Sequence, residues 1–263
     1  MSAASVGFVG AGRVARILLG GWGRAGVLPG DVRVTDPDGA AVDRLLAAEP
    51  TARRADLADV AAADVVLVGV HPPVMADTLT ALTGSLGPDT VVVSLAPVAR
   101  LENIVAVLGG DRLIARVIPN AASLVGAGFN PVAFGKRATS TTRELILGLF
   151  APLGAAPEVA DEDLEAYAIL TAMGPTYLWS QLYALVDVAG QIGLAPDDAA
   201  RAVGAMVAGA WRTMAEAGLS AEEVQDLVPV KPLAHAVGAM TSAYGDVLPD
   251  LHAKLSGKTH QQA

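Results

Sequence analysis

Hydrophobic residues in the first 160 positions gather into short runs that are separated by longer segments of mixed polarity. The runs are rich in valine, as expected of strands that are buried on both faces of a sheet. Between them, apolar residues recur at helical spacing, as at Val14, Ile17, Leu18 and Gly21. Strands that alternate with helices in this way predict an α/β fold with a doubly wound parallel sheet. The predicted strands span residues 6–9, 31–36, 51–55, 64–70, 90–95, 113–118, 131–134 and 155–159, the last two as edge strands.

The pattern changes at Asp161, and no segment after this residue has the pattern of a strand. The sequence Ser220-Ala-Glu-Glu is typical of the start of a capped helix. Prolines at 229, 232 and 249 are expected to divide the remainder into short pieces. The longer helices predicted for this half of the chain span residues 161–172, 175–194 and 197–217.

This change of pattern predicts two domains, an α/β domain over residues 1–160 and an all-α domain over residues 161–263. The helical part is rich in small residues, which allow close helix packing, and it carries more apolar positions than a small bundle can bury alone. A subunit interface is the natural way to cover them, so we expect a homodimer or a higher homo-oligomer. The apolar positions include Leu182, Leu185, Val186, Val203, Met206, Val207 and Trp211.

The turn after the first predicted strand has the spacing of a phosphate-binding loop. Gly10 permits a tight turn, Gly12 lets the backbone approach a pyrophosphate, and Ala15 takes the small third position of the G-x-G-x-x-G/A pattern. The following helix offers free N–H groups and its positive dipole end to the phosphates. This combination predicts a Rossmann-type dinucleotide site, with a tight turn that binds no ligand as the alternative. The residues expected to bind the dinucleotide here are Gly10, Ala11, Gly12, Arg13 and Val14.

An acidic residue, Asp36, closes the second predicted strand, about 20 residues beyond the glycines, where such folds contact the adenosine ribose. A carboxylate accepts hydrogen bonds from both ribose hydroxyls and repels a 2′-phosphate. We therefore expect NAD to be preferred over NADP. Arg33 is expected on the opposite side of its strand from Val32 and Val34. Arg53 and Arg54, on the next strand, could reach across and keep NADP as an alternative.

Composition and charge narrow the class of protein further. The net charge of −9 and the lack of a Lys/Arg cluster argue against nucleic acid as a partner. The chain has no cysteine, which excludes disulfides, thiolate metal sites and a cysteine nucleophile, and we expect no metal site. No apolar stretch reaches the length of a membrane span and no leader is recognisable, so a cytoplasmic protein is expected. Motifs of triad hydrolases, zinc proteases and P-loop proteins are absent.

Four motifs resemble those of the pyrroline-5-carboxylate reductase family, and the resemblance extends over nearly the whole chain. They are the fingerprint Gly7-Phe-Val-Gly-Ala-Gly-Arg-Val-Ala15, the segment Val68-Gly-Val-His-Pro72, the long match Arg116-Val-Ile-Pro-Asn-Ala-Ala-Ser-Leu-Val-Gly-Ala-Gly128, and Ala172-Met-Gly-Pro-Thr-Tyr177. The resemblance implies a dinucleotide-binding domain, a helical dimerisation domain and reduction of a C=N bond in pyrroline-5-carboxylate or a related cyclic imine. It also implies cofactor contacts from Val70, His71, Pro72, Ala96 and Asn120.

The chain departs from the family where the substrate carboxylate is expected to bind. The family pattern S-P-G-G-T-T is replaced here by Pro229-Val-Lys-Pro-Leu-Ala-His-Ala236. A second departure is Ser94-Leu-Ala-Pro-Val-Ala99, where the family has S-x-x-A-G-[VI]. Lys231 and His235 occupy the altered loop and become candidates for substrate binding or catalysis. Residues at the start of the first long helix complete the candidate set, namely Thr171 and Tyr177.

Two other functions stay open at this point. A dehydrogenase that acts on a C=O substrate needs a proton donor, which His235 or Lys231 could supply. The altered loop would also fit a dinucleotide-binding protein that has lost catalysis.

Overall fold

The computed structural model describes residues 4–257 and divides into two compact units. One unit runs to Met173 and also includes the described C-terminal residues 252–257, and the other spans Gly174–Leu251. The segment between 160 and 173 belongs to the first unit because Leu164 and Ala168 pack on Ile118 and Ala133 of the sheet domain. The domain boundary expected near residue 160 stays a prediction.

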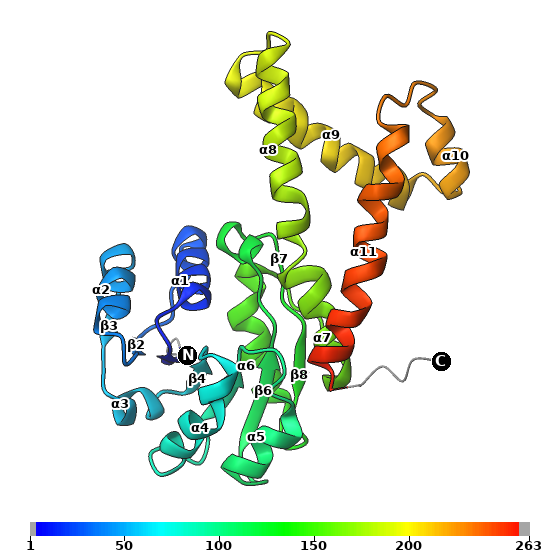
Figure 1. Cartoon of the computed structure of the whole chain (residues 1–263). Coiled ribbons are helices and arrows are strands. Elements are labelled where there is room, and N and C mark those ends of the chain that lie inside the picture. The colour runs from blue at the N-terminus through cyan, green and yellow to red at the C-terminus, as the bar shows by residue number, and fades with distance from the viewer. Residues whose placement is uncertain (1–3, 258–263) are drawn as a thin grey trace. The chain divides into compact units, whose positions relative to one another are not determined.

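The first unit (Figure 1) is built on a seven-stranded sheet, in which the strands have the order β3-β2-β1-β4-β5-β6-β8. All neighbouring strands are parallel except β8, which is antiparallel to β6. The order reverses between β1 and β4, and this reversal creates the switch point at which open α/β sheets bind ligands. The strands are β1 (Val6–Val9), β2 (Val32–Thr35), β3 (Ala52–Arg54), β4 (Val65–Val68), β5 (Val91–Ser94), β6 (Leu113–Val117) and β8 (Val132–Phe134).

Helices cover both faces of this sheet, so the predicted doubly wound α/β fold is confirmed. Helices α1 (Arg13–Ala25), α2 (Gly39–Ala48) and α6 (Ser140–Phe150) contribute to the core on one face. Helices α3 (Leu57–Ala61), α4 (Met75–Thr83) and α5 (Leu101–Leu108) contribute to the core on the other face. The central strands β1, β4 and β5 are buried along their whole length, which explains their uninterrupted apolar sequences.

Two glycines let α1 pack closely on the short helix η2 (Ala121–Val125), which follows β6. A Cβ atom added to Gly21 would lie 2.4 Å from the carbonyl oxygen of Ser123, and one added to Gly20 would lie 2.7 Å from a methyl group of Leu124. Both distances are far below van der Waals contact. The glycines of α1 therefore serve helix packing and fix the position of the segment that follows β6.

The second unit consists of α8 (Pro175–Gln191), α9 (Pro196–Glu216), α10 (Ala221–Asp226) and most of α11 (Ala234–Leu255). Helices α8 and α9 contact each other, yet each buries a single residue, Ala189 and Ala199 respectively. Their large apolar side chains are exposed instead. The most exposed on these two helices, with the residue that follows α8, are Tyr183, Met206, Trp211, Met214 and Ile192.

Three sequence expectations need correction. The edge strand expected over 155–159 is only β9 (Gly154–Ala155), which pairs with β7 (Gly128–Phe129) in a separate two-stranded sheet. Proline at 157 has no N–H to extend the ladder, and Glu158 forms an isolated bridge to Val132.

The helix expected over 161–172 is divided into the 3-10 turn η4 (Asp161–Asp163), α7 (Leu164–Tyr167) and the π-helical turn η5 (Ala168–Ala172). No proline or glycine marks these divisions, so nothing in the sequence indicates them. The expected break at Pro249 is also wrong, because α11 continues through it. The 22-residue helix tolerates the loss of one backbone hydrogen bond.

We predict opposite effects for two Gly→Ala substitutions in helices. Gly21→Ala places a methyl group against the backbone of Ser123 and should lower the free energy of unfolding by about 1–3 kcal/mol through overpacking. Gly148→Ala, in α6, meets no atom within 4 Å and should raise it by roughly 0.5–1 kcal/mol. Urea denaturation of both variants measures the difference. Equal effects would show that α1 and η2 are not in close contact.

Candidate functional site

A cleft of about 780 Å³ lies at the carboxyl ends of β1, β4 and β5, which is the switch point of the sheet. It is large enough for a cofactor or a drug-sized ligand. Its walls come from the glycine turn, from α1 and α2, and from the segments that follow β4 and β5. The lining residues are Ala11, Gly12, Arg13, Val14, Arg16, Ala41, Arg44, Gly69, Val70, His71, Pro72, Leu95, Ala96, Pro97 and Met173.

The two glycines of the turn have different physical roles. Gly10 has φ of 107°, and a Cβ there would lie 2.8 Å from the carbonyl oxygen of Gly69, so the fold itself requires glycine. Gly12 has no positive φ, and a Cβ there would meet nothing within 4 Å. Gly12 is the N-cap of α1 and carries no side chain that could cap the first turn. The space above it is open, as a bound phosphate requires.

The carboxylate of Asp36 lies against this turn. One oxygen accepts a hydrogen bond of 2.8 Å from the backbone N–H of Ala11, and the other accepts one of 2.8 Å from the N–H of Asp38. Each carboxylate oxygen can accept a second hydrogen bond. Asp36 is therefore held in a fixed orientation and retains the capacity to accept hydroxyl groups of a ligand.

The arginines on β2 and β3 are engaged in ion pairs. Arg53 donates to Asp59 at 2.6 Å and to Asp31 at 3.2 Å, and its hydrogen bond holds the pKa of the Asp59 carboxyl below its usual range. Arg33 donates to Asp31 at 2.7 Å. Arg54 donates to Asp43 at 2.6 Å. These contacts direct the three guanidinium groups toward carboxylates outside the lining of the cleft.

Three other arginines line the cleft, and two of them were missed by the sequence analysis. Arg13 and Arg16 lie on the first turn of α1, three residues apart and so on one helix face. Arg44 comes from α2 and approaches Asp38 at 3.4 Å in an exposed pair. Arg16 could have been predicted from the sequence, because its spacing of three residues from Arg13 puts both on one face of the helix. No sequence pattern pointed to Arg44, because the packing of α2 beside α1 brings it there.

The predicted cofactor residues fall into two groups. Four of those taken from the family resemblance line the cleft, namely Val70, His71, Pro72 and Ala96. Asn120 does not line it. Asn120 is 8% exposed at the start of η2, and its side-chain oxygen is buried without a hydrogen-bond partner among the described residues.

Thr171 and Tyr177 lie in different units. Thr171 is part of the π-helical turn η5, and its hydroxyl donates to the carbonyl oxygen of Tyr167 at 2.8 Å. Tyr177 is in the first turn of α8, with its ring 6.0 Å from that of Tyr244 on α11. Burial raises the pKa of the Tyr177 hydroxyl above its ordinary value.

Lys231 and His235 lie in the second unit, and both are exposed. Lys231 borders a hollow with the acidic residues of α10, Glu222, Glu223 and Asp226. His235 is near the start of α11, nine residues before Tyr244, which corresponds to about 14 Å along the helix axis. Within this unit the structure therefore does not bring His235 beside Tyr177.

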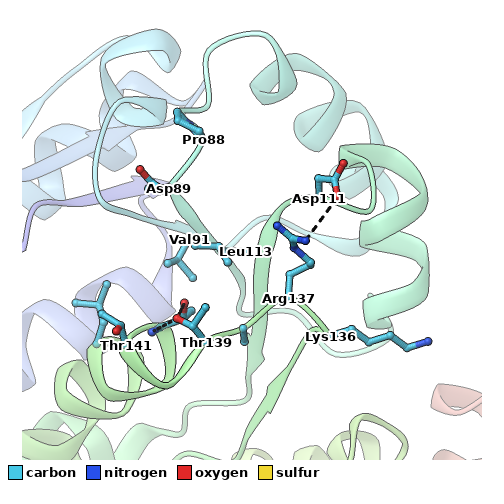
Figure 2. A pocket seen from close by; sticks show the side chains of 12 residues that line it. Pro88, Asp89, Val91, Asp111, Leu113, Lys136, Arg137, Thr139 and Thr141 are labelled. Atoms are coloured by element: carbon cyan, nitrogen blue, oxygen red, sulfur yellow. Dashed lines mark hydrogen bonds and ion pairs between the residues drawn. The ribbon is translucent and has the colours of Figure 1, made fainter.

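A second hollow opens at the opposite edge of the sheet, near the amino ends of β5 and β6 (Figure 2). Arg137 faces Asp111 there at 4.0 Å, and Lys136 extends away from this pair. The hydroxyl of Thr139 caps α6 by accepting the N–H of Thr142. These two contacts of the hollow serve the local structure, and ligands of open α/β sheets bind at the carboxyl edge instead. The cleft is therefore the candidate site.

Among residues 4–257 no helix is both long and apolar enough to cross a bilayer. The same residues contain no group of three histidine, aspartate or glutamate side chains that could hold a metal ion.

The strand order, the glycine turn and the acid that ends β2 define a protein of the Rossmann-type dinucleotide-binding class. A family model described as NADP oxidoreductase, coenzyme F420-dependent, matches residues 5–97. The pyrroline-5-carboxylate reductase of Pisum sativum is 31% identical over 196 residues, which cover 73% of this chain and 71% of that protein. The pyrroline-5-carboxylate reductase of Escherichia coli K12 is 29% identical over 230 residues, which cover 85% of this chain and 84% of that protein. The chain belongs to the pyrroline-5-carboxylate reductase family.

Solved structures share this fold. The pyrroline carboxylate reductase of Plasmodium falciparum, determined with NADP bound, has a TM-score of 0.80 at 18% identity, and the match covers 98% of this chain and 97% of that one. The pyrroline-5-carboxylate reductase of Streptococcus pyogenes has a TM-score of 0.80 at 16% identity, and the match covers 98% of this chain and 100% of that one. At these identities the likeness concerns the fold.

Proposed function

We propose that this protein is an NAD(P)H-dependent reductase that transfers hydride to the C=N bond of pyrroline-5-carboxylate or a closely related cyclic imine. The observation that carries this proposal is the cleft at the switch point, with open space above Gly12 and a fixed carboxylate at Asp36, in a chain of this family. A reduced nicotinamide supplies the hydride when it is bound. The chain supplies binding, alignment and exclusion of water.

Different residues around the cleft suit different parts of the dinucleotide. The open N-terminus of α1 with Arg13 suits the pyrophosphate, and Asp36 suits the hydroxyls of the adenosine ribose. The segments after β4 and β5 lie on the far side of the switch point from Asp36, where the nicotinamide half extends. We assign to that half the residues Val70, His71, Pro72, Ala96 and Asn120.

For the substrate end we propose Lys231 and His235 as ligands of the carboxylate, while roles for Tyr177 and Thr171 stay predictions of the sequence. A lysine ammonium forms strong, charge-assisted hydrogen bonds to a carboxylate. A protonated imine accepts hydride without a strong catalytic acid, so these residues are needed for orientation.

Turnover of the double variant tests this assignment. Lys231→Ala with His235→Ala should lower kcat/KM for pyrroline-5-carboxylate by roughly tenfold or more, since a hydrogen bond to a charged group contributes about 1.5–3 kcal/mol. NADH affinity should be unchanged. Lys136→Ala, in the hollow of Figure 2, is the matched control. Full activity of the double variant would remove both residues from the site. A wild-type enzyme that reduces keto acids but not the imine would refute the proposed reaction.

We also propose that NADH is preferred over NADPH. A 2′-phosphate placed about 4 Å from the carboxylate of Asp36 would be repelled by on the order of 4 kcal/mol per pair of unit charges before screening. Arg33, Arg53 and Arg54 are paired with other carboxylates and would have to leave them to compensate. Arg44 is the nearest alternative, because it lines the cleft and its pair with Asp38 is exposed.

The ratio of kcat/KM for the two cofactors measures this preference. We expect the ratio to favour NADH by about tenfold or more, and Asp36→Ser to reduce it, because serine removes the repulsion. A wild-type ratio that favours NADPH would contradict the proposal. Arg44→Ala would then tell whether that arginine binds the 2′-phosphate.

Gly12→Val tests whether the glycine turn holds the dinucleotide. The valine side chain meets no protein atom near its Cβ, so the midpoint of thermal unfolding should change little. It occupies the space of the pyrophosphate, so NADH affinity should fall by about 100-fold or more, the cost of losing helix N-terminal hydrogen bonds to a charged group. Gly110→Val, at a position with equally open surroundings near the amino edge of the sheet, is the control. Unchanged affinity in a fluorescence titration would place the cofactor elsewhere.

We propose a homodimer or a larger homo-oligomer assembled through the second unit. The support is the set of large exposed apolar side chains on α8 and α9, since monomeric proteins seldom expose such extended apolar surfaces. A cytoplasmic location stays a prediction of the sequence.

Sedimentation velocity at micromolar concentration should show a dimer or larger species. Trp211 is 66% exposed in the single chain. Trp211→Glu replaces this apolar residue with a charged one and should shift the protein toward monomer. Lys136→Glu should not. A monomeric wild-type protein would contradict the proposed assembly.

A further inference from the structure

An ionic cluster of Arg116, Asp161 and Glu165 lies beside the segment that follows β5. The side chains of Arg116 and Glu165 are both 0% exposed. One terminal nitrogen of Arg116 donates to Asp161 at 2.6 Å, and the other donates to Glu165 at 2.7 Å. Buried ion pairs often contribute little net stability, because desolvation offsets their attraction. The two carboxylates also form hydrogen bonds to the backbone, and these contacts indicate a role for the cluster other than stability.

Each carboxylate also accepts a backbone N–H from the segment after β5. Glu165 accepts the N–H of Val98 at 3.3 Å, and Asp161 accepts the N–H of Leu101 at 3.1 Å. Between these two points, Arg100 donates to the carbonyl oxygen of Ser256 at 2.9 Å. The segment is thus held at three places by groups from elements distant in the sequence.

The conformation of Val98 explains why the segment needs to be held. Its φ is 73°, and it is the one non-glycine residue with positive φ in the part of the chain that the structure describes. A β-branched residue is strained in this region and adopts it only where its surroundings enforce it. Val98 is 40% exposed, so burial of the valine does not offset the strain. The N–H contact to Glu165 is a direct restraint on this residue.

The restrained segment continues into the wall of the cleft. Leu95, Ala96 and Pro97 line the cleft and directly precede Val98. They follow β5, on the far side of the switch point from Asp36 and the adenosine end. We propose that Arg116, Asp161 and Glu165 are positioning residues that hold Leu95, Ala96 and Pro97 against the nicotinamide half of the cofactor. This inference rests on the proposed function, because it requires the cleft to bind a nicotinamide dinucleotide.

Glu165→Gln tests the inference, with NADH and ADP-ribose as the two ligands in calorimetric titrations. Glutamine retains an acceptor for Val98 but removes the charge that pairs with Arg116. NADH affinity should fall by about tenfold, since small displacements of a positioning wall have effects of this size or larger. ADP-ribose lacks the nicotinamide half, so its affinity should stay within about twofold, as expected of an independent site. A merely structural role would lower both affinities together.

Two further variants keep the test decisive. Glycine adopts positive φ without strain, so Val98→Gly combined with Glu165→Gln should lose less NADH affinity than Glu165→Gln alone. Asp161→Asn replaces a partly exposed carboxylate, and it should show the same selective loss if Glu165→Gln does not fold. Glu158→Gln, which removes the partner of Arg143 away from the cleft, is the control and should leave both affinities unchanged.

Failure of the positioning role and failure of the proposed function give different results in these titrations. Equal losses for NADH and ADP-ribose, no loss for either, or no recovery in the double variant would overturn the positioning role. A wild-type protein that binds neither ligand would refute the proposed function itself.

Discussion

The close approach of Gly10 to the backbone of Gly69 fixes the geometry on which the rest of the first unit depends. A Cβ at Gly10 would lie 2.8 Å from the Gly69 carbonyl oxygen, and the N–H of Gly10 donates to Thr35 at 2.8 Å. The turn is thereby held between the ends of β2 and β4. This placement decides where α1 begins, which way its free N–H groups point, and where the cleft opens. A larger residue at Gly10 would change all three at once.

Hydrogen bonds and ion pairs determine which charged side chains face the cleft. The chain carries a net charge of −9, yet three arginines line the cleft. Arg33 and Arg53 are paired with Asp31 and Asp59 outside the lining, whereas Asp36 is held by backbone N–H groups beside the turn. The result is a local surface that suits phosphates at one point and ribose hydroxyls at another. The buried carboxylate of Glu165 and the partly exposed carboxylate of Asp161 restrain one wall of the same cleft through hydrogen bonds to the backbone of Val98 and Leu101.

Local patterns predicted most of the fold and the glycine turn that lines the cleft. The valine runs identified the parallel strands of the main sheet, and the glycine spacing identified the turn, because strand burial and phosphate approach each impose a rule on a few adjacent residues. The division of 161–172 and the passage of α11 through Pro249 follow no such rule. Arg44 enters the cleft only because α2 packs beside α1. The strain at Val98 and its restraint by Glu165 join residues 67 positions apart, which no local pattern reveals.

Hydrogen–deuterium exchange with and without NADH tests most directly that the carboxyl edge of the sheet is the dinucleotide site. We expect slower exchange in three segments when NADH is added: the turn at 10–14, the segment at 69–72 and the segment at 95–98. The hollow at the amino edge, around residues 88–91 and 136–142, should be unaffected. Protection confined to that hollow, with none at the glycine turn, would contradict the account.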